Sequence, residues 1–241
     1  MPMDPIARER LGRAGVAAVT AALFRRNLRN QFLVGLAPLT PSLPNMVGPA
    51  FTLRFIPARE DIDTFESIRR SDSVLRRAVE ECPPGAVLMA DAGFDRRAGT
   101  AGDLLAGRLK FRGCAGMVTD GGFRDVRGVR KLGFAAYHNQ VAAGPPILGL
   151  HAADIETPIG CAGVAIYPGD IVVGDDDGVV VIPVSLAEEI ALEAAEATAY
   201  ETFAEQKIAE GHPMAAIFPA TAASKAEFED WRSQVSPALV V

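Results

Sequence analysis

The chain has 241 residues, of which 49% are hydrophobic and 22% charged, so disorder is excluded as its main state. This length is enough for one large domain or two small ones. The 30 acidic and 24 basic residues give a net charge of -6, which argues against a duplex nucleic-acid binder with a broad basic surface. An anionic small-molecule substrate remains compatible with this charge.

The three cysteines, Cys82, Cys114 and Cys161, are odd in number and widely spaced, so neither a disulfide framework nor a CxxC motif is expected. This usage favours a reducing cytoplasm. Apolar runs such as residues 15–24 are far shorter than the ~18 residues of a membrane span, so no membrane interaction is expected. The arginine-rich N-terminus contains acidic residues and continues into a helical pattern, which favours a part of the domain over a transit peptide.

Hydrophobic periodicity and turn residues predict an alternation of helices and strands. The expected helices are 4–33, 71–82, 100–110, 124–132 and 185–210, and the expected strands are 50–56, 86–90, 114–119, 134–138, 155–159, 164–167, 171–174 and 179–182. After Gly211 we expect an irregular tail with a short helix around Trp231. The pattern predicts a single α/β domain over residues 1–241, with partly parallel strands and a C-terminal helical arm and tail from about residue 185.

The stretch 99–133 contains two glycine-bearing turns, each leading to a predicted helix. At the first turn, Gly102, Asp103, Leu104 and Leu105 lie at the start of a helix. Unpaired backbone N–H groups and the positive end of the helix dipole meet there, which suits a carboxylate or a phosphate.

The second turn follows the apolar strand predicted over 114–119. It places Arg124 and Asp125 at the C-terminal end of a strand, where α/β folds usually hold ligands. Arg124 suits a substrate carboxylate or a developing oxyanion, and Asp125 suits a hard divalent ion that keeps most of its waters. The alternative is a tight glycine turn with Asp125 at a helix N-terminus and a solvated Arg124.

Two signatures in this stretch resemble those of the RraA-like family: Gly-Asp-Leu-Leu-Ala at 102–106 and Gly-x-x-Gly-x-Val-x-Asp-Gly-x-x-Arg-Asp at 113–125. The likeness covers about residues 15–200. The family includes class II 4-hydroxy-4-methyl-2-oxoglutarate/4-carboxy-4-hydroxy-2-oxoadipate aldolases, regulators of ribonuclease E activity and proteins labelled dimethylmenaquinone methyltransferase. The resemblance implies a swivelling three-layer β/β/α fold with N- and C-terminal helical arms, and a homotrimer or a dimer of trimers.

The resemblance also implies roles for individual residues. By similarity to the aldolases, the backbone from Gly102 to Leu105 and the side chain of Arg124 bind the pyruvate end of the substrate. Asp125 ligates Mg²⁺, Mn²⁺ or another divalent metal, and Asp103 has a supporting acid–base role through metal-bound water. Asp125 favours the enzyme branch, because the ribonuclease-regulator branch typically lacks this aspartate.

The implied activity is a carbon–carbon lyase that cleaves a 4-hydroxy-2-oxo acid to pyruvate through a metal-stabilised enolate and also decarboxylates oxaloacetate. The alternative is a non-catalytic protein that regulates a ribonuclease. A Schiff-base mechanism is disfavoured because Lys110 and Lys131, the lysines near the motif, fall at predicted helix ends where cations are usually solvated. The physiological 2-oxo acid stays open.

The remaining polar residues give weaker signals. His138, His151 and His212 are isolated and are expected to be structural or on the surface. The acidic run 174–178 lies between two predicted strands, which favours a hairpin turn over a calcium loop.

Two further segments are left open. The glutamates of the final helix are expected on its solvated face, or, by resemblance, near a neighbouring subunit's site; they are Glu193, Glu196, Glu201 and Glu205. The region 59–77, rich in arginines, is expected to shape the substrate pocket or the subunit contacts.

Overall fold

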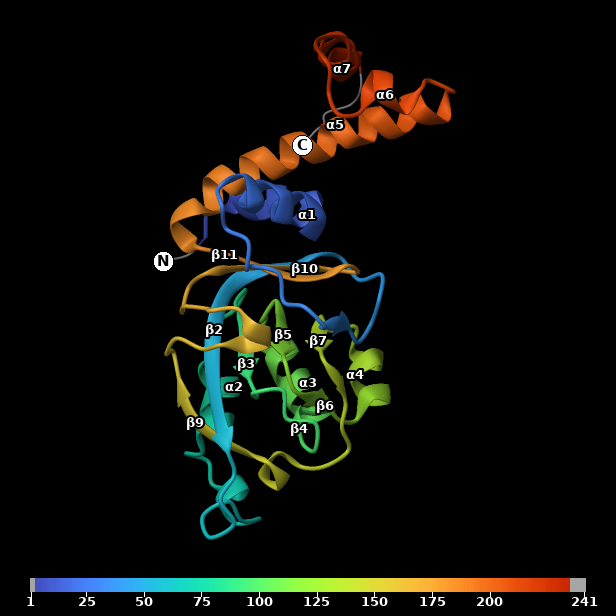
Figure 1. Cartoon of the computed structure of the whole chain (residues 1–241). Helices are drawn as coiled ribbons and strands as arrows, with labels where there is room; N and C mark the ends of the chain where they lie inside the picture. Colours follow the sequence, from blue (N-terminus) through green and yellow to red (C-terminus); the bar gives the residue numbers. More distant parts are fainter. Residues whose placement is uncertain (1–2, 235–241) are drawn as a thin grey trace.

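The structure, a computed structural model that describes residues 3–234, is a mixed α/β fold (Figure 1). Its strands are β1 Ala37–Pro38, β2 Met46–Pro57, β3 Val87–Asp91, β4 Gly99–Ala101, β5 Gly116–Thr119, β6 Gly122–Phe123, β7 Ala136–His138, β8 Gln140–Val141, β9 Leu150–Ile155, β10 Ile171–Asp175 and β11 Gly178–Ile182. Its α-helices are α1 Pro5–Arg25, α2 Val74–Glu81, α3 Asp103–Phe111, α4 Val126–Leu132, α5 Ala187–Ala209, α6 Met214–Ile217 and α7 Ala222–Gln234. Short 3-10 helices lie at Ser67–Arg69, Pro146–Leu148, Cys161–Gly163 and Val184–Leu186.

The larger sheet has the strand order β1-β7-β5-β3-β2-β10-β11, and β9 also pairs with β2. The four strands from β7 to β2 run parallel, whereas β1, β9, β10 and β11 are antiparallel to their neighbours. β2 is long enough to pair with β10 through residues 46–49 and with β3 through residues 50–54. A smaller sheet, β4-β6-β8, is parallel throughout.

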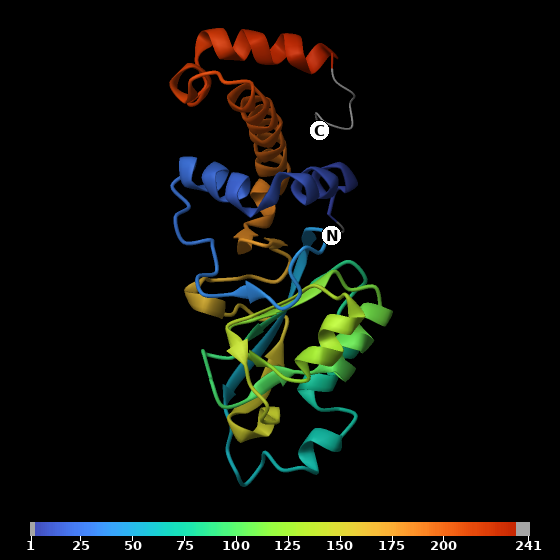
Figure 2. The same ribbon diagram turned by 90° about the vertical axis from the view of Figure 1, so that its right-hand side faces the viewer.

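Apolar side chains build the layers. Helices α2, α3 and α4 cover one face of the parallel strands, and Leu88 and Leu109 belong to the core between them (Figure 2). The opposite face packs against β10 and β11 through a core that includes Met89, Val118 and Val172. Helices α1 and α5 cover the other side of that hairpin. This arrangement confirms the predicted three-layer β/β/α fold with helical arms.

Helix α1 is kinked within its length. Gly15 has φ 74° and ψ 166°, a conformation that strains residues with a side chain. Oδ2 of Asp175 accepts a hydrogen bond at 2.7 Å from the N–H of Val16, just after the kink. Asp175 ends β10, and its register with Gly178 confirms the predicted hairpin. Asp175, one of the acidic residues of the run 174–178, therefore accepts a backbone hydrogen bond from α1 at the kink.

Several elements differ from their predicted bounds. The helix predicted over 4–33 ends at Arg25, and the helix predicted from Thr100 begins at Asp103. The strand predicted over 155–159 is β9, which spans residues 150–155. Residues 164–167, predicted as a strand, form only an isolated bridge, between Ile159 and Ile166. Residues 99–101 are a strand because they pair with β6, from which residues 102–121 separate them. Local pattern does not reveal such a partner.

Ion pairs fasten α5 to α1. Glu193 accepts hydrogen bonds from Nε of Arg25 and Nη1 of Arg26, each at 2.5 Å. Burial raises the pKa of Glu193, but the hydrogen bonds from Arg26 and Arg25 outweigh burial and hold this pKa below its ordinary value. Glu193 therefore binds a helix of its own chain, contrary to the expected solvated face.

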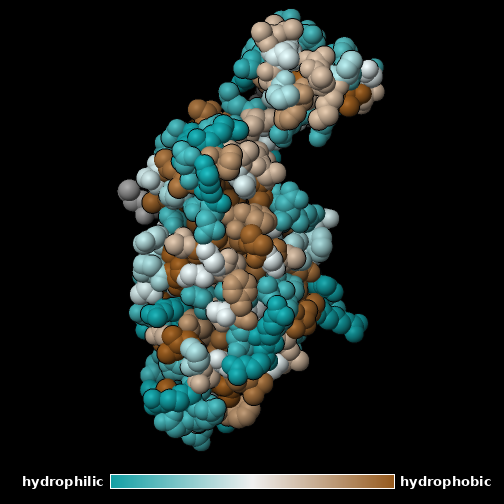
Figure 3. All heavy atoms as spheres, viewed as in Figure 1, coloured by the Kyte–Doolittle hydropathy of each residue, from teal (hydrophilic) through white to brown (hydrophobic). Residues whose placement is uncertain are grey.

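The second half of α5 projects from the body, and α6 and α7 fold back against it (Figures 1 and 3). Tyr200, Phe203, Phe228 and Trp231 form an aromatic cluster with ring centroids 5.3 to 5.9 Å apart. The tail is thus more helical than predicted, because α7 uses these rings to pack on α5. Within residues 3–234, no helix combines the length and the apolar character that a bilayer crossing requires.

Candidate active site

The two glycine-bearing motifs meet through the pairing of two short strands. β4 and β6 run parallel, and the N–H of Arg124 donates to the carbonyl oxygen of Ala101 at 2.9 Å. Equivalent ends of parallel strands lie at the same edge of a sheet. Gly102, which follows β4, is therefore next to Arg124 and Asp125, which follow β6.

The start of α3 offers unpaired backbone donors. Gly102 is the N-cap residue, and no side chain caps the helix. The N–H of Ala106 bonds to the carbonyl oxygen of Gly102 at 3.0 Å, so the earlier N–H groups of Asp103, Leu104 and Leu105 precede the helical hydrogen-bond ladder. These donors and the positive end of the helix dipole suit a carboxylate, as predicted.

Asp125 and Arg124 lie against this helix start. Asp125 has φ 53°, a left-handed conformation that aspartate tolerates better than most residues. Nε of Arg124 donates to Oδ2 of Asp125 at 3.1 Å, and the two side chains are 36% and 42% exposed. A Cβ on Gly102 would lie 2.4 Å from that same Oδ2 and 3.0 Å from Cγ of Arg124. Only glycine at position 102 allows this close approach.

Asp103 packs against α4. A Cβ on Gly128 would lie 2.4 Å from Oδ2 of Asp103 and 2.7 Å from Cβ of Asp103. The Asp103 side chain therefore packs against α4 at Gly128, where a larger residue would clash with it. The structure thus brings the six predicted site residues to one wall of a cavity of about 700 Å³.

The remaining walls of this cavity come from other parts of the fold. β2 contributes Phe55, and β9 contributes Leu150 and His151. Much of the arginine-rich region also faces it, including Arg70 and Arg76. The region 59–77 therefore lines the cavity, in agreement with the first of the two roles expected for it.

The donor set at Asp125 fits a hard divalent cation. Among residues 3–234, no group of three or more His, Cys, Asp or Glu side chains is placed to hold a metal. The Asp125 carboxylate nevertheless lines the cavity and is 42% exposed, and its Oδ2 packs against Gly102 where a Cβ would stand. One carboxylate in an open cavity is the environment expected for Mg²⁺, which keeps several waters and takes further oxygens from its substrate. It does not suit a closed structural zinc site.

Asp120 of the second signature has a structural role. It is 1% exposed and accepts hydrogen bonds from the N–H groups of Ala92 at 2.6 Å and Ala162 at 3.2 Å. Burial raises the pKa of Asp120, although these two hydrogen bonds act in the opposite direction. The carboxyl group fixes the turn that leads to β6, and hence the position of Arg124.

The other candidate residues lie elsewhere. His138 packs its ring edge-on against Phe123 at 6.2 Å, and His212 is exposed. Lys110 donates to the carbonyl oxygen of Leu132, and Lys131 is exposed at the end of α4. No lysine is among the cavity-lining residues within the described chain. These histidines and lysines therefore keep the structural or surface character expected of them.

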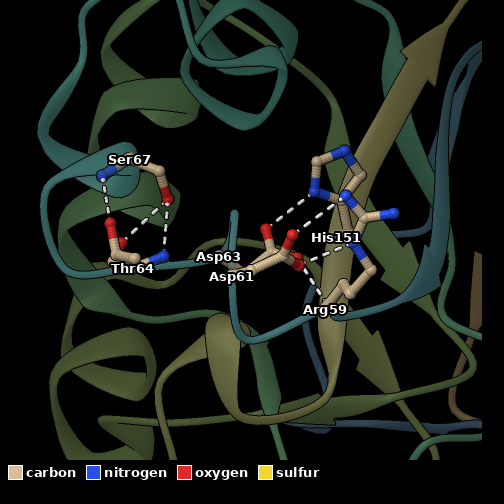
Figure 4. Close-up of polar contacts among 6 residues, drawn as sticks. All are labelled: Arg59, Asp61, Asp63, Thr64, Ser67 and His151. Atoms are coloured by element: carbon tan, nitrogen blue, oxygen red, sulfur yellow. Dashed lines mark hydrogen bonds and ion pairs between the residues drawn. The ribbon is translucent and has the colours of Figure 1, made fainter.

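His151 is a cavity residue that sequence reasoning did not single out. Its Nδ1 lies 2.7 Å from Oδ1 of Asp63, and both side chains line the cavity (Figure 4). The two residues are 88 positions apart, and no motif connects them. Only the pairing of β9 with β2, which sets His151 opposite Ile56, reveals their proximity.

The fold is that of an α/β protein, and its candidate site lies at the carboxyl ends of two parallel strands, with a helix N-terminus and an arginine that suit a small anion. The chain belongs to the Aldolase/RraA family, since the RraA-like family profile matches residues 16–181. A 4-hydroxy-4-methyl-2-oxoglutarate aldolase of Thermus thermophilus is 30% identical over 115 residues, which is 46% of this chain and 68% of that protein. A Halalkalibacterium halodurans protein, named as a candidate for the same activity, is 40% identical over 115 residues. That match covers 47% of this chain and only 54% of the relative.

Solved structures agree with this membership. RraAS2 of Streptomyces coelicolor, described as an unusual member of the RNase ES inhibitor RraA family, is 33% identical with a TM-score of 0.76, covering 85% of this chain and 98% of that one. A Geobacillus kaustophilus protein titled S-adenosylmethionine:2-dimethylmenaquinone methyltransferase is 28% identical with a TM-score of 0.51, covering 68% of this chain and 94% of that one. The resemblance stated from the two signatures is therefore confirmed.

Proposed function

We propose that the protein is a divalent-metal-dependent carbon–carbon lyase that cleaves a 4-hydroxy-2-oxo acid to pyruvate and a carbonyl product, and that also decarboxylates oxaloacetate. The observation that carries this proposal is the convergence of the α3 N-terminus, Arg124 and Asp125 on one cavity wall. The relatives named as aldolases support the same reaction class.

Each group on this wall has a part in binding the substrate. The free N–H groups at the start of α3 bind the carboxylate of the 2-oxo acid. Arg124 uses only Nε in its contact with Asp125, and among the described residues its terminal amino groups form no hydrogen bond, so they are available to the substrate. Its fixed positive charge stabilises the negative charge that develops on the 2-oxo oxygen when the carbon–carbon bond breaks. Asp103, held against α4, supports proton transfer on this wall.

Asp125 would hold the divalent cation, which when bound supplies Lewis-acid stabilisation of the same developing charge. The carboxylate is suited to this because its backbone conformation turns it away from capping α4 and toward Gly102.

The test is pyruvate release by the purified protein from oxaloacetate and from 4-hydroxy-4-methyl-2-oxoglutarate. We expect release from at least one of them with added Mg²⁺ or Mn²⁺, and loss of that release in excess chelator. Absence of release from both substrates with either metal would contradict the lyase proposal.

A second candidate function is a non-catalytic regulator that binds a ribonuclease, favoured by the 33% identity to RraAS2. Binding of the purified chain to a ribonuclease E preparation would be measured for the wild type and for Asp125→Asn. A regulator should bind equally well in both forms, because its binding would not depend on a catalytic metal ligand.

A further inference from the structure

A second polar group faces the cavity, apart from the α3 N-terminus. His151 comes from β9, and Asp63 comes from the segment between β2 and the 3-10 helix Ser67–Arg69. Figure 4 shows Nδ1 of the His151 ring facing the Asp63 carboxylate, with the second ring nitrogen on the far side.

Asp63 is held rigidly. Its side chain is 7% exposed, and Oδ2 accepts the N–H of Arg59 at 2.8 Å while Oδ1 meets His151 at 2.7 Å. The N–H of Asp63 also donates to the carbonyl oxygen of Arg59 at 2.8 Å, which closes a tight turn. A carboxylate fixed in this way sets the orientation of the imidazole ring.

The pairing also determines which ring nitrogen is available. A carboxylate accepts hydrogen bonds, so a neutral His151 places its proton on Nδ1 and leaves a lone pair on Nε2. Among the described residues, no hydrogen bond to Nε2 is formed, and the His151 side chain is 34% exposed. The ring therefore presents a proton acceptor to a cavity ligand.

We propose that His151 is the general base of the cleavage reaction and that Asp63 is its positioning residue. This inference rests on the proposed lyase function and adds the group that starts the bond cleavage. The α3 N-terminus, Arg124 and His151 line the same cavity, so a substrate whose pyruvate half is bound by the first two can present its 4-hydroxyl group to His151.

Protons and electrons balance over the cleavage step. Nε2 of His151 takes the proton of the 4-hydroxyl group, the oxygen electron pair forms the new C=O bond, and the C3–C4 bond breaks. Its electron pair passes into the enolate of pyruvate, where Arg124 stabilises the charge. C3 of the enolate takes a proton from water, and His151 returns its proton to solvent, so that the products are pyruvate and a carbonyl compound.

Decarboxylation of oxaloacetate offers an internal comparison, because oxaloacetate carries no hydroxyl proton to remove. Both reactions use the same anion site and the same enolate. A general base should therefore matter for cleavage and be dispensable for decarboxylation.

The experiment compares wild type, His151→Gln and Asp63→Asn in both reactions with Mg²⁺. His151→Gln should lower kcat for cleavage by at least about 100-fold, with KM and the rate of decarboxylation changed less than about threefold. Asp63→Asn should lower kcat for cleavage by about tenfold in the same selective way, since an amide orients the ring less firmly. His138→Gln, on a half-buried histidine outside the cavity, is the matched control and should change neither reaction selectively.

Two results would overturn the assignment. One is full cleavage activity in His151→Gln, and the other is an equal loss of both reactions, which would show that the pair only tethers the segment to β9. If thermal unfolding shows that His151→Gln does not fold, the ratio of the two rates in Asp63→Asn decides: an unchanged ratio overturns the proposal. Failure of the lyase function itself is distinct, because the wild type would then release no pyruvate from either substrate.

Discussion

Gly102→Ala tests whether the contact between the α3 N-terminus and Asp125 sets catalytic geometry. The backbone of Gly102 has φ -134°, which alanine adopts without strain, so the change acts through its Cβ alone. That Cβ would lie 2.4 Å from Oδ2 of Asp125, whereas heavy atoms pack best at about 3.5 Å, so the carboxylate must retreat by about 1 Å. A displacement of this size in a catalytic group costs about 100-fold in rate, or about 2.7 kcal/mol.

We therefore expect Gly102→Ala to lower kcat/KM for metal-dependent pyruvate release by about 100-fold, with little change in the thermal unfolding midpoint. Gly107→Ala is the matched control in the same helix, because its Cβ would meet Leu132 at 3.7 and 3.9 Å, an ordinary packing distance. This control should keep wild-type kcat/KM and gain up to about 1 kcal/mol of stability from the better helix former. Wild-type kcat/KM in Gly102→Ala, or an equal loss in the control, would refute the reasoning.

Three further changes test other parts of the structure. Asp125→Asn keeps the size of the side chain but removes its charge, so Mg²⁺-dependent turnover should fall by about 100-fold or more at an unchanged melting temperature. Wild-type turnover in this variant would exclude Asp125 as the metal ligand. Glu193→Gln should lower the free energy of unfolding by about 1 kcal/mol at pH 7. Because the pKa of Glu193 is lower in the folded state than its ordinary value of 4.5, the ionised carboxylate stabilises the fold above pH 4.5, and this stabilisation is lost as the pH falls through the folded-state pKa. If urea denaturation gave the same difference in unfolding free energy between variant and wild type at pH 7 and in acid, this reasoning would be contradicted. Gly15→Ala should cost about 1–3 kcal/mol in urea denaturation, because alanine is strained at φ 74°, and a neutral result would mean that the kink relaxes.

The candidate site was predictable where its signals are local. A turn, a helix start and a charged pair following a strand all lie within residues 99–133, and the structure places them as their order suggests. The pairing of β4 with β6 was not predictable, because strands of three and two residues carry too little pattern to be distinguished from helix starts or turns. The convergence of the two turns was expected only from the family resemblance, which assigned both of them to the pyruvate end of the substrate.

Residues that meet only through tertiary structure were missed. His151 and Asp63 come from distant segments, and an isolated histidine is structural more often than functional. The role of Glu193 was missed for the same reason, because its partners Arg25 and Arg26 lie on another helix. The early end of α1 follows from Asn27, whose φ of 63° leaves the helical region, and sequence periodicity alone does not fix such a stop.

The arm formed by α5, α6 and α7 has a geometric consequence. The body and the aromatic cluster are joined by one 23-residue helix, which still touches α1 at Thr198 and carries the cluster from Tyr200 onward. Each residue added to that helix turns everything beyond it by about 100° and moves it about 1.5 Å outward. One inserted residue would thus point the cluster in a new direction, whereas seven would restore the direction to within about 20° and lengthen the arm by about 10 Å. The direction and length of the arm are therefore set by the length of α5, and both can change without any change in the residues of the cavity.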